Sequence, residues 1–282
     1  MGSKTSKLIC PTTTETKAPG IPQDIIDEIL DHLAADSDIR SLRACALVSK
    51  SWTQPCRCRL FHTAVFASWH VDRWLKMFPV PEEGPARQVR DLHVEIGWDD
   101  PVPDKLFEHT PWFTSVDRIS LLGHMAPPSS LKPSSWKLPQ FITSLTINAS
   151  VFTLVQVRDV IAQMPNLDDL TLMGSLIEVD RSELPGIGTV VRGRFGGKLK
   201  LCGEFVGEDV ADMLLEIPSG LRFSEAVIDC TPERLPSAVR VVEGCCKTLV
   251  KLSHTVAFPR ESHPFPQSNE ISMLTPFSGR RL

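Results

Sequence analysis

Apolar residues recur along most of the chain in a repeated, strand-like frame. In four successive segments, apolar residues occupy a first position and the third and fifth positions after it: Val89/Leu92/Val94, Val116/Ile119/Leu121, Ile142/Leu145/Ile147 and Leu167/Leu170/Leu172. Weaker copies follow at Leu199/Leu201, Phe223/Ala226/Ile228 and Leu249/Leu252. The central positions are residues 92, 119, 145, 170, 199, 226 and 252, which lie 25 to 29 residues apart. Alternation with period two predicts strands, and a spacing this regular predicts stacked repeats.

Between several of these strands lies a second recurring element, with apolar residues at i, i+3, i+4 and i+7 followed by a proline. The copies are Val71, Trp74, Leu75, Phe78, Pro79; Val157, Val160, Ile161, Met164, Pro165; and Val210, Met213, Leu214, Ile217, Pro218. A looser copy is Val239, Val242, Cys246. This spacing predicts one-sided helices that end at the proline.

Strand and helix alternating with a period of about 26 residues resemble leucine-rich repeats, which stack parallel strands on a concave face with helices behind. One feature departs from that family. Five residues after each central position, where regular repeats carry asparagine or cysteine, this chain has Gly97, His124, Ser150, Ser175, Glu204, Thr231 and Ala257. We therefore expect an irregular α/β solenoid over residues 67–257. An ordinary α/β domain with a parallel sheet is the alternative.

The strand frame also predicts which side chains point away from the helices, because alternate side chains of a strand lie on opposite faces. The neighbours of the central residues are almost all polar. If the sheet is concave, these neighbours are the best candidates for contact with a target protein. The charged or titratable members are Asp91, His93, Arg118, Asp169, Lys198, Lys200, Glu225 and Lys251.

In residues 21–65 the apolar residues are spaced differently, at intervals of three and four, which predicts helices. Ile25, Ile29 and Leu33 recur every four residues, with Pro22 at a first-turn position. After a polar break, a second one-sided pattern predicts a single helix through Leu42, Cys45, Val48 and Trp52, ended or bent by Pro55. So small a unit buries too little surface to be comfortably stable alone, so it needs a neighbouring domain or a partner.

This region resembles an F-box, in particular those of mushroom-forming fungi. The matching pattern is Ile21-Pro22-x-x-Ile25-Ile26-x-x-Ile29-x-x-x-Leu33, then Leu42-x-x-Cys45-x-Leu47-Val48-Ser49-x-x-Trp52, then Leu60-Phe61. Ile21 replaces the usual leucine, and Gln23-Asp24 replaces the usual acidic second position. The resemblance assigns residues 20–66 to the box, which in that family docks on the Skp-type linker of a cullin ubiquitin ligase. It implies that six residues divide between linker contact and the box's own core: Pro22, Ile25, Ile29, Leu42, Val48 and Trp52.

Composition narrows the class of protein. The 282 residues carry 30 basic and 34 acidic side chains, a net charge of −4, which disfavours a nucleic-acid binder driven by bulk positive charge. No run of 18 apolar residues and no apolar signal core are present, so we expect an intracellular protein, cytoplasmic or nuclear. Eight cysteines are too dilute for a disulfide scaffold. We expect residues 1–19 to be a disordered lead-in and residues 258–282 a Pro-rich disordered tail.

Two short motifs bear on chemistry and targeting. Cys56-x-Cys58 with His62 is at most half of a zinc site, because zinc normally takes four ligands and no second pair is nearby. Met1-Gly2-Ser3-Lys4-Thr5-Ser6 fits the N-myristoylation pattern at Gly2. A single myristoyl chain binds membranes only marginally, so Lys4, Lys7 or an acylated Cys10 would have to add a second attraction.

No phosphate-binding loop and no signature of a hydrolase or metalloprotease occurs in the chain. We therefore expect no catalytic residue, no metal and no cofactor. The sequence favours a non-catalytic adaptor: the F-box-like region binds a Skp-family linker, and through it a cullin, while the solenoid holds an unknown target protein for ubiquitination. One alternative is a repeat-based interaction scaffold without a ubiquitin role, peripheral to a membrane if Gly2 is acylated. The other is a hydrolase or metal enzyme.

Overall fold

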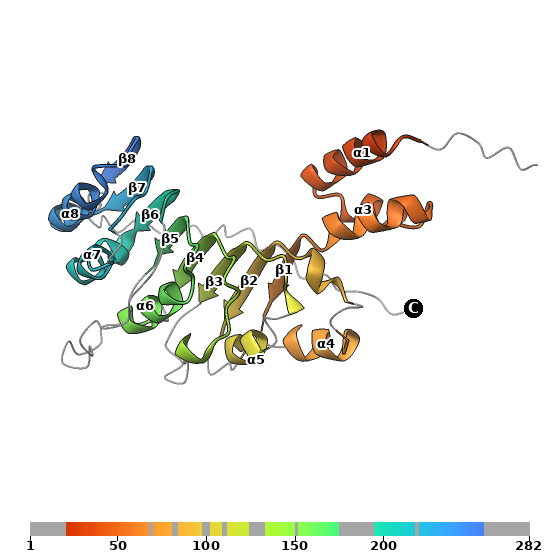
Figure 1. The fold of residues 1–282 in the computed structure, drawn as a ribbon, viewed down its shortest axis with the longest axis horizontal. Helices are drawn as coiled ribbons and strands as arrows, with labels where there is room; N and C mark the ends of the chain where they lie inside the picture. Colours follow the sequence, from red (N-terminus) through yellow and green to blue (C-terminus); the bar gives the residue numbers. More distant parts are fainter. Residues whose placement is uncertain are drawn as a thin grey trace, which may run out of the picture.

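The computed structural model describes residues 21–67, 70–80, 84–97, 102–108, 112–123, 133–149, 152–174, 195–217 and 220–256. The predicted disordered segments and Gly2 lie outside these residues. The described part consists of an N-terminal helical bundle followed by a curved α/β solenoid (Figure 1). The predicted fold class, a small helical region followed by parallel strands with helices behind, is confirmed.

The bundle contains α1 (Gln23–Ala35), α2 (Ile39–Cys45) and α3 (Lys50–Leu60). Pro22 precedes the first turn of α1, and the Asp38 side chain caps α2 by accepting a hydrogen bond from the Ser41 N–H at 3.0 Å. The three helices pack around a small core of their own. Its fully buried members are Ile26, Leu30, Leu42 and Cys56.

The prediction of one helix from Leu42 to Trp52 was wrong. The chain leaves α2 at Ala46, and Ser49 is extended, with φ −161° and ψ 167°, before α3 begins. The apolar steps fitted a single helix because α2 and α3 pack on the same core. Pro55 was expected to end or bend the helix, but it lies inside α3, which continues to Leu60.

The solenoid is built on one parallel sheet, whose eight strands in the described residues follow chain order from β1 to β8. The strands are β1 (Thr63–Phe66), β2 (Asp91–Ile96), β3 (Arg118–Gly123), β4 (Ser144–Ala149), β5 (Asp169–Met173), β6 (Lys198–Cys202), β7 (Glu225–Cys230) and β8 (Lys251–Val256). The strands pair in chain order without crossovers, as they do in stacked repeats. Each unit therefore contacts only its neighbours and depends on them for stability.

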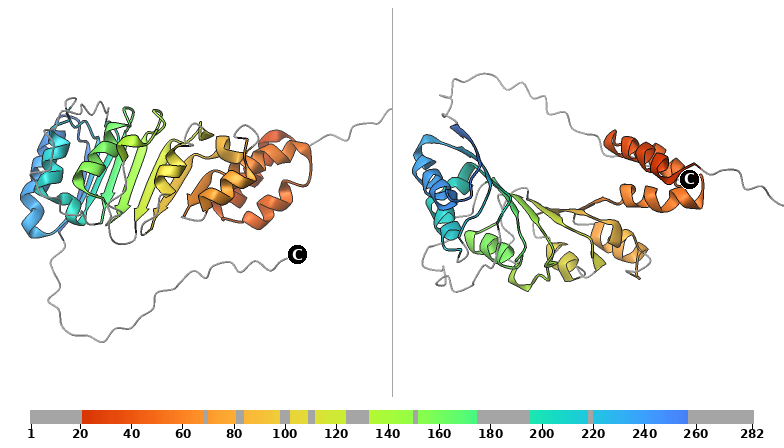
Figure 2. Two further views of the ribbon diagram at one scale, coloured as in Figure 1. Left: turned by 90° about the horizontal axis from the view of Figure 1, so that it is seen from below. Right: turned by 45° about the horizontal axis from the view of Figure 1, so that its top comes forward.

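Five α-helices lie on one face of this sheet: α4 (His70–Met77), α5 (Val102–Glu108), α6 (Leu154–Ala162), α7 (Glu208–Leu215) and α8 (Leu235–Cys245). Short 3-10 helices are η1 (Pro85–Gln88), η3 (Pro133–Ser135), η5 (Gly203–Val206) and η6 (Pro232–Arg234). The helices lie on the convex side of the curved sheet, so the opposite, helix-free face is concave (Figure 2). The bundle lies beyond the β1 edge, and β8 forms the other edge.

The register of the strands matches the sequence frame. Leu92, Ile119, Leu145, Leu170, Leu199, Ala226 and Leu252 are paired partners across seven successive strands. One strand was missed: β1 pairs with β2 and places Ala64 opposite Leu92. The sheet therefore begins inside the range 20–66 that the sequence assigned to the helical region. Helix α5 was also not predicted.

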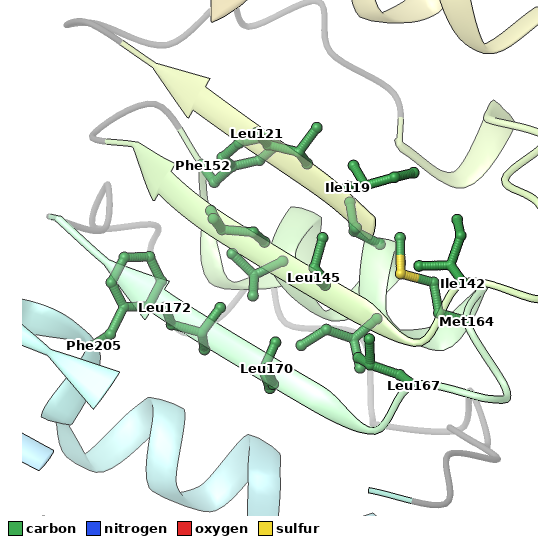
Figure 3. Close-up of a cluster of buried hydrophobic side chains, with 14 of the residues drawn as sticks. Ile119, Leu121, Ile142, Leu145, Phe152, Met164, Leu167, Leu170, Leu172 and Phe205 are labelled. Carbon is green, nitrogen blue, oxygen red and sulfur yellow. The ribbon is translucent and has the colours of Figure 1, made fainter. Parts of the chain in front are cut away.

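The inward columns form a continuous aliphatic core against the helices. Figure 3 shows Leu145 between Ile119 and Leu170, with Phe152 and Met164 covering the ends of the strands. Leu145 and Leu170 are fully buried. A capping box stabilises the N-terminus of helix α6. The Thr153 hydroxyl accepts a hydrogen bond from the Gln156 N–H, and the Gln156 side chain accepts one from the Thr153 N–H.

The column allows a test of burial, since leucine also occupies an exposed position outside it. We expect Leu145→Ala to lower the free energy of unfolding by about 2–5 kcal/mol, because a cavity forms among packed neighbours. Leu47→Ala should cost less than about 1 kcal/mol, because that side chain is 88% exposed. Urea denaturation followed by circular dichroism measures both, and equal losses would contradict the described packing.

Candidate protein-docking surfaces

The bundle presents an exposed aliphatic stripe along α1. Ile21, Ile25 and Ile29 are 55%, 43% and 39% exposed, and Pro22 is exposed beside them. Ile25 and Ile29 are four residues apart, so they lie on one side of the helix, next to the buried stripe of Ile26 and Leu30, and Ile21 lies just before its first turn. Helix α1 thus uses one apolar face for its own core and leaves an adjoining one to solvent.

A second exposed apolar pair lies between α2 and α3. Leu47 is 88% exposed and Val48 66% exposed. They occupy tight turns, in which the Leu47 and Val48 N–H groups donate to the carbonyls of Ala44 and Cys45. This is the strongest apolar exposure of the bundle, and Leu47 was not among the predicted linker-binding residues.

The six predicted linker-binding residues divide by burial. Pro22, Ile25, Ile29 and Val48 are exposed, whereas Leu42 is only 1% exposed and belongs to the bundle core. Trp52 is half-buried and packs against the same core. Leu42 and Trp52 therefore support the shape of the bundle rather than offering surface.

Arg59 ties α3 to α1 and so positions the exposed stripe. Its Nε donates to Asp31 Oδ1 at 2.8 Å, and a terminal nitrogen donates to the Asp27 carbonyl at 3.2 Å. The Asp27 carboxylate is also 3.4 Å away. The Arg59 side chain is 18% exposed, so the guanidinium is partly shielded from water in these contacts. Sequence reasoning noted Arg59 only as part of a basic stretch, since nothing local marks partners about 30 residues away.

The bundle joins the sheet through a short connection at His62. Its carbonyl accepts hydrogen bonds from the Arg90 and Asp91 N–H groups at 2.8 and 3.0 Å. Its Nδ1 lies 3.3 Å from Asp91 Oδ2. Since α3 ends at Leu60 and β1 begins at Thr63, these contacts limit rotation of the bundle about the sheet.

All eight predicted target-binding residues lie on the concave, helix-free face. The strand register aligns them in columns. The first column contains Asp91, Arg118, Asp169, Lys198, Glu225 and Lys251; the second contains His93 and Lys200. The predicted orientation of these side chains is confirmed.

Most charges of the first column contact one another. The Arg118 guanidinium lies 2.5 Å from Asp91 Oδ1, a charge contact that is not aligned as a hydrogen bond. Glu225 lies between two ammonium groups, 2.6 Å from Lys251 and 3.8 Å from Lys198. The hydrogen bond from Lys251 holds the pKa of Glu225 below its usual value, and the nearby Lys198 charge adds to this. This column is therefore largely self-neutralising.

Asp169 has a structural partner as well. Its carboxylate accepts a hydrogen bond from the Lys198 N–H at 2.6 Å, at the start of the next strand. A Cβ at Gly197 would collide with that carboxylate and displace it, so glycine there permits the close approach. Asp169 thus connects β5 to β6 and is a poorer candidate for target contact than its position in the sequence indicated.

The second column offers side chains that the described residues do not pair by ion pairs. The column runs from Val65 to Ser253. Within it, His93 and Lys200 flank Ser120, Thr146 and Thr171. All five are half-buried at the base of the curved face. A row of hydroxyl groups flanked by an imidazole and an ammonium group can donate and accept hydrogen bonds to a bound polypeptide.

A third column contains a thiol–carboxylate contact that sequence reasoning missed. Cys202 and Asp229 are paired partners on β6 and β7, and the Cys202 thiol donates to Asp229 Oδ2 at 3.3 Å. Burial raises the pKa of Cys202 to about 11, and the Asp229 carboxylate contributes to the shift. The thiol is therefore protonated, and poorly nucleophilic, near neutral pH.

The half metal site of the sequence does not assemble in the described part of the chain. Cys56 is buried in the bundle core, Cys58 is exposed, and His62 pairs with Asp91. Among the described residues, no three His, Cys, Asp or Glu side chains are grouped to hold a metal ion. In the same residues, no helix has both the length and the apolar character to cross a bilayer.

Comparison with known proteins adds no further assignment. A scan against protein-family models finds no match. A search of curated proteins finds no significant relative.

The Cys202 contact predicts a specific pH dependence. Because the folded-state pKa lies near 11 and the ordinary value is 9.0, the neutral thiol stabilises the fold below pH 9, and this contribution is lost as the pH rises from 9 to 11. Alkylation of Cys202 by iodoacetamide, followed by peptide mass spectrometry, should accelerate only toward pH 11. Asp229→Asn should shift that profile to lower pH. A midpoint already near pH 9 in the unaltered chain would contradict the contact.

Proposed function

We propose that this protein is a non-catalytic substrate-recognition adaptor of a cullin ubiquitin ligase. The α1–α3 bundle acts as an F-box that docks on a Skp-family linker, and the concave face of the solenoid holds the target protein. The observation that carries the proposal is the exposed aliphatic stripe of Ile21, Ile25 and Ile29 on a bundle whose own core is already filled. An exposed apolar surface of this kind is typical of a protein-binding site.

The division of the bundle's apolar residues into buried and exposed sets supports a role in docking on a linker. The F-box pattern contains more apolar positions than so small a core can hold, and the structure separates them into two sets. Ile26, Leu30, Leu42 and Cys56 fill the core. Those that remain outside include two positions that the resemblance assigns to the linker on α1, Ile25 and Ile29.

The joint between bundle and sheet supports an adaptor role as well. An adaptor raises the effective concentration of target lysines near a ubiquitin-charged enzyme, which requires that its two docking surfaces keep a defined relation. The His62 carbonyl, bonded to two N–H groups of the sheet, and the Arg59 contacts within the bundle restrict that relation. The concave face then contributes contact chemistry rather than catalysis.

The linker surface can be tested with a matched pair of double variants. Ile25→Gln with Ile29→Gln removes the apolar stripe while keeping a good helix former at both positions. We expect binding to a Skp-family linker to weaken at least about tenfold, because two aliphatic contacts of about 1 kcal/mol each are lost. Isothermal titration calorimetry with the purified linker measures the change.

The control is Leu235→Gln with Val239→Gln on α8. These residues have the same spacing and similar exposure, 38% and 46%, but lie at the opposite end of the molecule. This variant should bind the linker like the unaltered chain. Absence of linker binding by the unaltered chain would reject the adaptor and favour a scaffold outside ubiquitin chemistry. Trp52 is a poor probe, because its replacement disturbs the bundle core.

A further inference from the structure

The last unit of the solenoid leaves its apolar side uncovered in the described residues. In the central inward column, Ala64 is 8% exposed and the next six members, from Leu92 to Ala226, are at most 1% exposed. Leu252, the eighth member, is 49% exposed. Every residue of β8 from Lys251 to Thr255 is exposed, whereas β7 alternates between buried and half-buried.

The neighbouring surface is apolar too. Val250, immediately before β8, is 87% exposed, and Leu235 and Val239 on α8 are 38% and 46% exposed. Strand β8 pairs with β7 on one side, while no described strand pairs with its other side. An uncovered edge with apolar side chains invites association with another strand or segment. Stacked repeats normally end in a unit that closes this side.

We propose that residues 257–282 of this same chain lie against the β8 edge and close the end of the solenoid. The segment follows β8 directly and is about as long as one repeat. It carries apolar side chains suited to cover Leu252 and Val250. These are Phe258, Phe265, Ile271, Met273, Leu274 and Phe277.

Tethering favours this segment over a second copy of the chain. A covalently attached segment meets the edge at an effective concentration of about a millimolar, far above that of a separate molecule in dilute solution. Pro259, Pro264, Pro266 and Pro276 lack an N–H group, so the segment cannot extend a regular ladder along its whole length. It covers the edge mainly through its side chains and blocks further strand addition, as prolines do at natural sheet edges.

The experiment uses the full chain with a diazirine side chain introduced at position 252. Equal amounts of unlabelled and ¹⁵N-labelled protein are mixed, irradiated and digested, and cross-linked peptides are identified by mass spectrometry. We expect cross-links from position 252 to residues 257–282, with both peptides carrying the same isotope label. Ile271→Ser with Met273→Ser, elsewhere in the same chain, should reduce their yield at least about threefold.

The control places the same group at position 65, on β1 at the other edge of the sheet. Val65 is 50% exposed, which matches Leu252 at 49%. Its yield of cross-links to residues 257–282 should be at least about tenfold lower. Products that join labelled to unlabelled chains would show that a second copy covers the edge and would overturn the proposal. Equal yields from both positions, or no product with this segment, would also overturn it.

Discussion

Stacking of one unit on the next is the interaction on which this molecule depends. Each strand donates and accepts backbone hydrogen bonds along its neighbour, and each central aliphatic residue is covered by the corresponding residues before and after it. Leu145 is fully buried because Ile119 and Leu170 lie on either side of it. No unit could bury its apolar side alone, so stability, curvature and the concave face are consequences of the array rather than of any single repeat.

The same stacking decides what the concave face can do. A column of the sheet brings together residues that are about one repeat apart in sequence, so charges on successive strands become neighbours. Opposite charges on adjacent strands, such as Asp91 and Arg118, then pair with each other. Pairs of this kind at the surface contribute little to stability, but they leave less charge for a partner. The hydroxyl row of the second column, with His93 and Lys200 beside it, makes no ion pairs among the described residues, so its hydrogen-bonding capacity is not used up in this way.

The sequence predicted the repeated strands well, but it missed short elements and the break between two helices of the bundle. Seven central strand positions could be found because a period-two pattern recurred at a regular spacing, and the register confirms each of them. Strand β1 was missed because it is four residues long and has alanine, a weak apolar signal, at its central position. Helix α5 was missed because it contains Pro103 and is only seven residues long, about two turns, which gives no clear periodicity. The break between α2 and α3 was hidden because both helices face one core.

The candidate surfaces show the same limit. The outward orientation of the eight concave residues follows from strand alternation alone, and it was predicted. Which of them pair depends on register: Asp169 meets the Lys198 N–H only because β5 and β6 lie side by side. The Arg59 contacts with α1 likewise join residues about 30 positions apart. A local sequence pattern carries no information about contacts between residues so far apart in the chain. It therefore predicted the surfaces but not the side chains, such as Arg59 and Asp169, that hold them in place.

A linear array has two ends, and the two ends of this one differ. At β1, Ala64 and Phe66 are buried, and Phe66 contacts Trp74 and Phe113, with ring centroids 5.2 and 5.9 Å apart. The connection at His62 also holds the bundle at this edge. At β8 the inward residues remain exposed. Of the fourteen large apolar side chains exposed in the described residues, six belong to the bundle and four to the region of α8 and β8. Exposed apolar surface is therefore concentrated in the bundle and at the β8 end, and a second polypeptide segment at each, as proposed above, would remove that surface from water.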